Sequence, residues 1–83
     1  MTYRVEWSLR ALDRAAGFLK DDLPGVALVL DEVDLLADDP RSPATRSYGI
    51  HHLRRLRVGR YRVLFEVLDD EALVRVVHVG RIG

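Results

Sequence analysis

The stretch HHLRRLRVGRYRVLFEV, residues 51–67, has the pattern of a β-hairpin. Apolar and polar side chains alternate on both sides of Val58-Gly59, which predicts strands at about 52–57 and 60–68 joined by a tight turn. Gly59 suits the turn because glycine adopts a positive φ without strain. Alternation in the second strand predicts one face with Tyr61, Val63, Phe65 and Val67, and an opposite face with Arg60, Arg62, Leu64 and Glu66.

The same alternation extends to the neighbouring strands. Leu56 and Val58 belong with the apolar set, and a last strand is expected at LVRVVHV, residues 73–79, after a turn at 69–72. His78 shares its parity with Val74 and Val76, so it is expected on the core side of the sheet. Four arginines then gather on the face away from the core, with Arg54 as the exception: Arg55, Arg57, Arg62 and Arg75.

The N-terminal half predicts one strand and two helices. TYRVEW, residues 2–7, alternates as a strand, and Ser8 is a suitable N-cap for a helix at about 9–20. The core stripe expected for this helix is Leu9, Leu12, Ala16 and Leu19, with Phe18 beside it. DDLPG, residues 21–25, ends it, and Pro24 suits the first turn of a second helix that ends near Asp38. The second stripe is Val26, Val29, Leu30, Val33, Leu36 and Ala37.

Residues 40–49, PRSPATRSYG, have the composition of a loop. The predicted order is therefore β-α-α-β-β-β. This order indicates a single α+β domain, residues 1–83, in which a helical hairpin packs on one face of a mainly antiparallel four-stranded sheet.

Composition limits the chemistry. The chain has no cysteine, so it offers neither disulfides nor thiolate metal ligands, and three histidines without a carboxylate at ligand spacing predict no metal site. The lack of cysteine fits a reducing compartment, and no apolar run approaches the length of a membrane span. We expect a cytoplasmic protein with no cofactor and no membrane partner.

Charge is divided unevenly in a chain whose net charge is zero. Residues 1–40 carry four basic and nine acidic groups, whereas residues 41–83 carry nine arginines and four acidic groups. This asymmetry favours a polyanion-binding surface beside an acidic one. The alternative is that the two halves simply attract each other.

Gathered arginines suit a phosphate chain, because each guanidinium binds phosphate oxygens through two parallel hydrogen bonds. Like charges on one sheet face repel one another unless an anion compensates them. The alternative is a solvated face with local pairs through Glu66, but one glutamate cannot balance four or five arginines.

The segment LRRLRVGRYRVLFEVLDDEALVRVVHVGR, residues 53–81, resembles the RelE/ParE toxin superfamily of bacterial type II toxin–antitoxin pairs. Its motif is L-R-x-G-x-Y-R-V-x-[FY]-E-V, followed by a polar turn and a valine-rich strand that ends in V-G. The resemblance implies a RelE-like fold and a cognate antitoxin as partner, with operator DNA bound through the antitoxin of the complex.

The resemblance implies two activities and one lesser role. RelE-type members are ribosome-dependent, metal-independent endonucleases, in which the ribose 2′-hydroxyl of messenger RNA attacks its own 3′-phosphate. ParE-type members poison DNA gyrase. A degenerate, non-catalytic member would only bind its antitoxin.

The resemblance also implies residue roles. Arg62 matches the arginine that holds the scissile phosphate, Arg55 a basic strand position of the site, and Arg57 a further one. The family pattern G-[KH]-R and the aromatic residue of its tail are replaced here by VGRIG, residues 79–83, so Arg81 lies one position before the place of the family arginine. Leu53 stands where some members carry lysine.

Histidines are the candidates for the missing proton transfers, because imidazole titrates near neutral pH. His51 and His52 precede the arginine strand, and His78 is near the end of the last one. The candidate catalytic residues are Arg62, Arg55, Arg81 and His52, and the candidate RNA-binding residues are Arg57, Arg60, Arg54 and Arg75. Tyr48 and Trp7 are candidate stacking surfaces, although packing is the better interpretation of Trp7.

Overall fold

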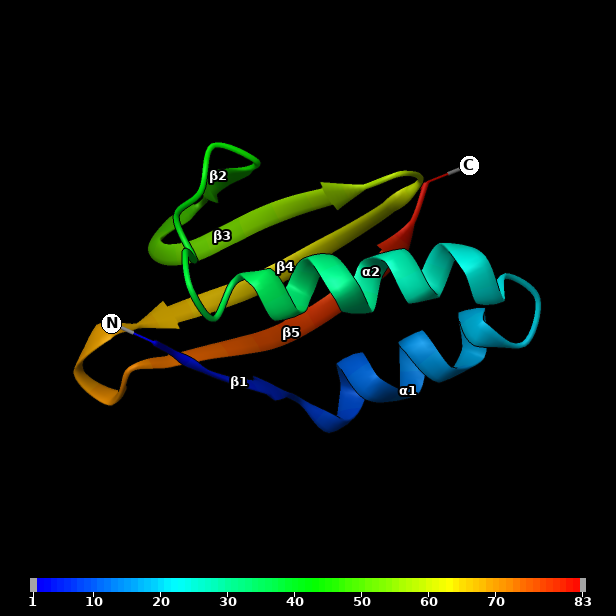
Figure 1. The fold of residues 1–83 in the computed structure, drawn as a ribbon, viewed down its shortest axis with the longest axis horizontal. Coiled ribbons are helices and arrows are strands. Elements are labelled where there is room, and N and C mark those ends of the chain that lie inside the picture. Colours follow the sequence, from blue (N-terminus) through cyan, green and yellow to red (C-terminus); the bar gives the residue numbers. More distant parts are fainter. Residues whose placement is uncertain (1, 83) are drawn as a thin grey trace.

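A computed structural model describes residues 2–82, apart from the side chain of His51. It contains two helices and five strands with one short 3-10 turn, in the order β1 (Arg4–Trp7), α1 (Leu9–Leu19), α2 (Leu23–Leu35), β2 (Thr45–Tyr48), β3 (Ile50–Val58), β4 (Tyr61–Leu68), η1 (Asp69–Glu71) and β5 (Leu73–Arg81). The sheet order is β1-β5-β4-β3-β2, with β1 parallel to β5 and the other neighbours antiparallel (Figure 1). The predicted α+β class is confirmed.

The sheet has one strand more than the sequence predicts. Residues 45–48 lie in the segment assigned to a loop, but they form β2 and pair antiparallel with β3, with Thr45 opposite Leu56. The prediction failed because proline, serine and glycine dominate the segment and hide the four residues TRSY. Thr45 is buried, and its hydroxyl donates to the Ser42 carbonyl over 2.8 Å.

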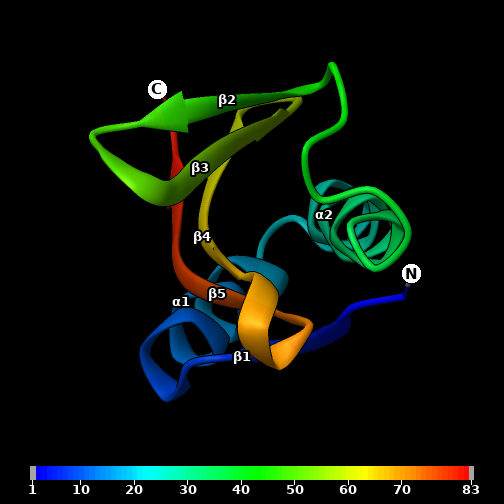
Figure 2. The same ribbon diagram turned by 90° about the vertical axis from the view of Figure 1, so that its left-hand side faces the viewer.

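The core lies between α2 and the concave face of the curved sheet (Figure 2). The predicted alternation of β4 is confirmed, since Tyr61, Val63, Phe65 and Val67 are all buried while the residues between them are partly exposed. From α2, the residues Val26, Val29 and Val33 fill the same core, and Leu36 follows at its end. Gly59 has a φ of +57° in the β3–β4 turn, as its place between the strands predicts.

Caps begin both helices. The Ser8 hydroxyl accepts from the Ala11 amide over 3.1 Å, which confirms the predicted N-cap of α1. The Asp22 carboxylate caps α2 by accepting from the Gly25 amide over 3.2 Å, and Pro24 lies in the first turn.

The apolar stripe predicted for the first helix is wrong. Ala11 and Ala15 are the buried residues of α1, whereas Leu9, Leu12 and Leu19 are 85%, 48% and 41% exposed. The small alanines let α1 approach β5 so closely that the Arg14 Nε donates to the Val79 carbonyl over 3.3 Å. Leu30 of the second stripe is also exposed. Within residues 2–82, no helix is long and apolar enough to cross a membrane.

Candidate nucleic-acid interface

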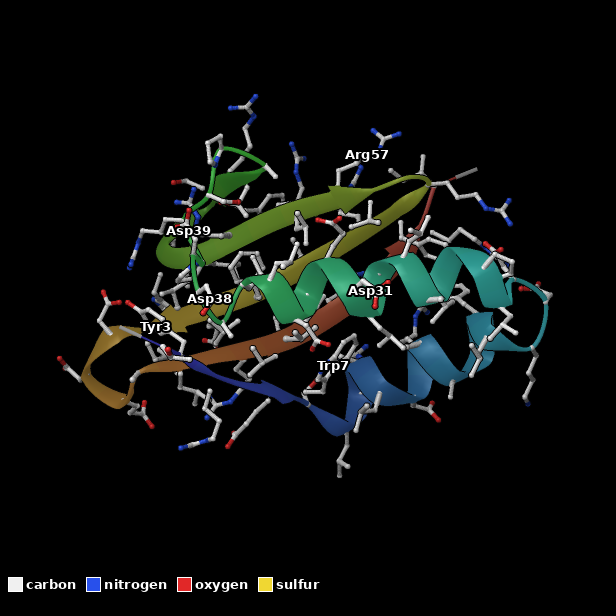
Figure 3. All side chains as sticks on the ribbon, viewed as in Figure 1. Tyr3, Trp7, Asp31, Asp38, Asp39 and Arg57 are labelled. Carbon is white, nitrogen blue, oxygen red and sulfur yellow. The ribbon has the colours of Figure 1, made fainter. Side chains whose placement is uncertain are left out.

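Four arginines lie on the sheet face that points away from α2, and we call Arg46, Arg55, Arg57 and Arg62 the arginine face. Strand register brings them together: Arg46 of β2 is opposite Arg55 of β3, and Arg57 of β3 is opposite Arg62 of β4. Figure 3 shows Arg57 projecting from the end of β3, away from both helices. Like charges directly opposite each other destabilise a sheet, and a bound anion would relieve this repulsion.

No residue in the described part of the chain forms an ion pair with the arginine face. Arg57 Nε donates to its neighbour, the Gly59 carbonyl, over 3.1 Å, and the Arg55 guanidinium lies 5.9 Å from the ring centre of Tyr48. The Arg62 Nε is buried and has no hydrogen-bond partner among the described residues. A buried donor without a partner costs free energy, which a bound phosphate oxygen would recover.

The other end of the same face is neutralised by Glu66. The Arg75 Nη1 donates to Glu66 Oε1 over 3.5 Å, and the His52 Nε2 lies 3.2 Å from Glu66 Oε2. Glu66 and Arg62 are four residues apart on one strand, which separates them by about 13 Å. The alternative interpretation, local pairs through Glu66, therefore applies to this end of the sheet. His52 contacts Glu66 and does not lie beside Arg62. Arg75 is on the predicted face but is held at the same acidic end.

Three other candidate arginines lie away from the arginine face. The Arg81 Nη1 donates to Asp21 over 2.9 Å and its guanidinium lies over the Phe18 ring at 4.7 Å, so this side chain is on the helix side. The Arg60 Nη2 donates to Asp22 over 3.4 Å, at the same helix junction.

Arg54 also belongs to the helix side of the sheet. It donates to the Thr45 hydroxyl from two nitrogens, over 2.9 and 3.1 Å, and to the Ser47 hydroxyl over 3.3 Å. The prediction that Arg60 shares a face with Arg62 is wrong because Arg60 precedes β4 and turns to the acidic junction instead.

That acidic junction is a compact polar cluster. The Tyr61 hydroxyl donates to Asp22 over 2.6 Å, and this hydrogen bond is the largest cause that lowers the pKa of the carboxyl, followed by the Gly25 amide. The hydrogen bonds from Arg81 lower the pKa of Asp21 in the same way. These contacts tie β5 and the start of β4 to the α1–α2 connection.

His78 lies on the opposite face from the one that alternation predicts. The β4–β5 register shifts between Leu64 and Phe65, because Leu64 pairs with His78 while Phe65 pairs with Val76. Val77 is thus an extra residue, a β-bulge, and it reverses the parity of the residues that follow. Val79 is buried accordingly, and the side chain of His78 projects on the same side of the sheet as the arginine face.

The imidazole of His78 lies beside Arg62. Its Nε2 would be 3.0 Å from a Cβ placed on Gly80, so the ring leans over Gly80, the residue directly opposite Arg62. Burial lowers the pKa of His78, and the positive charges of Arg14, Arg10 and Arg62 lower it further. A neutral imidazole beside a guanidinium can take up a proton from a substrate hydroxyl and return it to a leaving oxygen.

Three basic residues of this region were missed by sequence reasoning. Arg46 was hidden in the segment assigned to a loop, Arg14 of α1 donates to the Val79 carbonyl of β5, and the charge of Arg10 acts on His78. Arg10 and Arg14 are polar positions of α1, and the stripe predicted for that helix gave no reason to place them beside β5.

The remaining candidates divide between packing and exposure. Trp7 is partly buried against the core, which agrees with the packing interpretation, whereas Tyr48 is exposed and lies next to Arg55. The side chain of His51 lies outside the described residues. Among those described, no group of three or more His, Asp or Glu side chains has a metal-binding arrangement.

Comparison with known proteins agrees with this architecture. The family model described as the ParE toxin of the type II toxin–antitoxin system parDE matches residues 5–82. No curated protein sequence matches the chain.

Solved structures share the fold at low sequence identity. A mutant of the Escherichia coli toxin RelE in the free state has a TM-score of 0.81 at 22% identity, covering 98% of this chain and 84% of that one. The RelE–RelB complex from Pyrococcus horikoshii has a TM-score of 0.80 at 23% identity, covering 100% and 98%. The ParDE system of Pseudomonas aeruginosa has a TM-score of 0.81 at 14% identity, covering 99% and 98%.

The match of one family model to nearly the whole described chain, on a fold shared with RelE and ParE structures, settles the family. The chain belongs to the ParE toxin family of type II toxin–antitoxin systems, within the RelE/ParE superfamily.

Proposed function

We propose that this toxin is a ribosome-dependent, metal-independent endonuclease that cleaves messenger RNA. The observation that carries the proposal is the arginine face with His78 beside Arg62, where four guanidiniums have no ion pair among the described residues. A phosphate chain is the anion that several arginines bind best, and the alternating row can follow successive phosphates of a single strand.

The proposed reaction uses the RNA's own 2′-hydroxyl. His78 Nε2 accepts the proton of this hydroxyl as the 2′-oxygen forms a bond to phosphorus, and Arg62 stabilises the additional negative charge on the phosphate oxygens. The bond from phosphorus to the 5′-oxygen then breaks, and the imidazolium returns its proton to that oxygen. The products are a 2′,3′-cyclic phosphate and a 5′-hydroxyl. His78 thereby takes the role expected of His52.

The ribosome would supply orientation, because the chain offers few groups that could splay a base. Tyr48 is the exposed aromatic ring next to the arginine face. Alignment of a nucleophile and a phosphate accounts for a large part of the rate of such a reaction, so free RNA should be cleaved poorly. The proposed partners are therefore the ribosome and messenger RNA, together with a cognate antitoxin, since several solved structures of similar fold are toxin–antitoxin complexes. Binding of that complex to operator DNA through the antitoxin is part of the same proposal.

Primer extension on messenger RNA after induction tests the activity. Cleavage at defined sites is expected with the wild-type chain, and little or none with Arg62→Ala or His78→Gln at equal expression. Arg60→Ala is the matched control, because Arg60 pairs with Asp22 away from the arginine face. Equal cleavage by Arg62→Ala and Arg60→Ala would remove the reaction from this surface.

Gyrase poisoning is the second candidate, and the description of the matching family model as a ParE toxin favours it. This activity needs a binding surface and no proton transfer. Double-strand DNA breaks and an SOS response on induction, with messenger RNA intact, would replace the nuclease proposal. A chain that gives neither readout and only binds an antitoxin would be the degenerate member.

A further inference from the structure

Helix α1 carries two arginines on the side that borders the outer face of the sheet. The helix packs against β5, and Figure 2 shows it at the edge of the sheet, whereas α2 covers the concave face. The Arg14 Nε donates to the Val79 carbonyl of β5 over 3.3 Å. Arg10 lies one turn earlier, and residues four apart share one side of a helix, so both arginines flank the last part of β5.

Neither of these arginines is compensated by an acid. Both side chains are exposed, and within residues 2–82 neither Arg10 nor Arg14 forms an ion pair. Like charges four residues apart destabilise a helix. The first turn of α1 contains no acidic residue, so the positive end of the helix dipole adds to the charge of Arg10. An anion bound at this place would relieve the repulsion.

His78 connects this pair with the arginine face. Strand β5 is the neighbour of β4 on one side, and α1 lies on its other side, so the imidazole of His78 is between Arg62 and the two arginines of α1. Burial is the largest cause that lowers the pKa of His78, and the charges of Arg14, Arg10 and Arg62 follow it. Positive charge therefore continues from β4 across β5 to α1.

A hollow of about 340 Å³ lies beside Arg14, at the far end of this path. The residues that line it are Asp13, Arg14, Gly17, Phe18 and Arg81. Arg81 is neutralised by Asp21, whereas the hydrogen bond of Arg14 to Val79 uses Nε and leaves both terminal nitrogens for a phosphate. The hollow is large enough for a small organic group, so it can hold the nucleoside attached to that phosphate.

A single RNA strand fits the two groups of arginines together. The arginine face occupies β2, β3 and β4, so a strand that crosses it and continues over His78 reaches α1. This path leaves the sheet at its edge, and a flexible single strand can follow it, whereas a duplex, with a persistence length of about 150 base pairs, resists such a bend.

We propose that Arg10 and Arg14 form a second phosphate-binding subsite, the α1 subsite, which holds the RNA strand on the far side of His78 from the arginine face. The phosphate at Arg62 then lies between two bound segments of the strand, which suits cleavage at an internal position. The proposal rests on the proposed binding of RNA to the arginine face and adds the path that the strand takes beyond it.

Fluorescence anisotropy with uridine oligomers of two lengths tests the α1 subsite. An oligomer of about five nucleotides supplies about four phosphates, one for each residue of the arginine face, whereas one of about ten can also reach α1. At about −0.7 for each contact, the slope of log K against log salt concentration should be about −2.8 for the short oligomer and about −4.2 for the long one. Between 50 and 200 mM salt, the affinity should fall about 50-fold and about 300-fold, respectively.

Variants of α1 locate the additional contacts. Arg10→Ala with Arg14→Ala should return the slope for the long oligomer to about −2.8 and leave the short oligomer unchanged. Because Arg14 also bonds to β5, Arg10→Ala alone is the second variant, and it should give about −3.5 with the long oligomer. Arg41→Ala with Arg60→Ala is the matched control, since both residues pair with aspartates, and circular dichroism checks the fold of each variant.

Four results would overturn the α1 subsite. They are equal slopes for the two oligomers, a slope for the long oligomer that the α1 variants do not change, a control variant that lowers this slope as much, and loss of polyglutamate binding in the α1 variants without loss of RNA binding. The last result would assign α1 to an acidic protein segment. Failure of the proposed function looks different, because Arg62→Ala would then leave binding of the short oligomer unchanged.

Discussion

The salt dependence of RNA binding is the most direct test of the arginine face. Each arginine that neutralises a phosphate of single-stranded nucleic acid contributes about −0.7 to the slope of log K against log salt concentration. Four such contacts, from Arg46, Arg55, Arg57 and Arg62, give a slope of about −2.8. Affinity for a short single-stranded RNA should then fall about 50-fold between 50 and 200 mM salt.

The perturbation is the double substitution Arg55→Ala with Arg57→Ala. Removal of two of the four contacts should lower the slope to about −1.4 and the loss over the same salt range to about sevenfold. The fold should not suffer, since Arg57 faces the like charge of Arg62 across the β3–β4 pair and its removal relieves that repulsion. Fluorescence anisotropy across a salt titration measures the slope, and thermal unfolding checks the fold.

The matched control removes two arginines that already have partners. Arg41 pairs with Asp69 over 2.9 Å and Arg60 with Asp22 over 3.4 Å, so Arg41→Ala with Arg60→Ala makes the same change in net charge away from the face. The slope should stay near −2.8 for this variant. If both double variants lower the slope equally, net charge rather than the arranged face explains the binding, and the reasoning from strand register is refuted.

Three further predictions concern stability. Phe65→Ala should lower the free energy of unfolding in urea by about 3–5 kcal/mol, because the ring is fully buried, whereas Leu28→Ala should change it by no more than about 0.5 kcal/mol. The Tyr61 hydroxyl lowers the pKa of Asp22 from 3.8, so the ionised carboxylate stabilises the fold above pH 3.8 and this stabilisation is lost as the pH falls through the pKa of the folded state. Asp22→Asn should therefore reduce the dependence of the melting temperature on pH in this range. An unchanged dependence of the melting temperature on acid pH would contradict this prediction. The pKa of His78 in the folded state is below 6.5, so protonation of the imidazole favours the unfolded state. His78→Gln should therefore remove the fall in melting temperature below pH 6.5. A fall that persists in this variant would show that other groups titrate in this range.

The strand hairpin was predictable because its pattern is local. Burial of Tyr61, Val63, Phe65 and Val67 follows from period-two alternation beside a turn glycine, and the arginines opposite them follow from the same parity. Arg55, Arg57 and Arg62 therefore lie together as the sequence predicts. The roles assigned to them from the family resemblance stay predictions.

The errors arise where tertiary packing overrides a local pattern. In α1, leucines form the stronger stripe, but the close approach to β5 needs small residues, and Ala11 and Ala15 supply them. In β5, one bulge at Val77 reverses parity, and no residue of LVRVVHV marks the position of that bulge. Sequence reasoning therefore placed His78 in the core and chose His52 instead.

The ion pairs of the structure bear on the two explanations of the charge asymmetry between the halves of the chain. If the halves merely attracted each other, their charges would be paired across the fold. Two such pairs exist at the helix junction, Arg81 with Asp21 and Arg60 with Asp22. Within residues 2–82, the arginine face and the five carboxylates of residues 31–39 remain without ion pairs.

Unpaired charges of opposite sign thus occupy opposite sides of a small domain whose net charge is zero. Each set repels itself, and this self-repulsion costs stability in the free chain. An anion bound to the arginine face would relieve one set, so it should raise the melting temperature by binding the folded state. Because the two surfaces lie on different sides of the core, occupation of one leaves the other accessible. If the chain cleaves RNA as proposed, an antitoxin that inhibits the cleavage must therefore include a segment that reaches the arginine face.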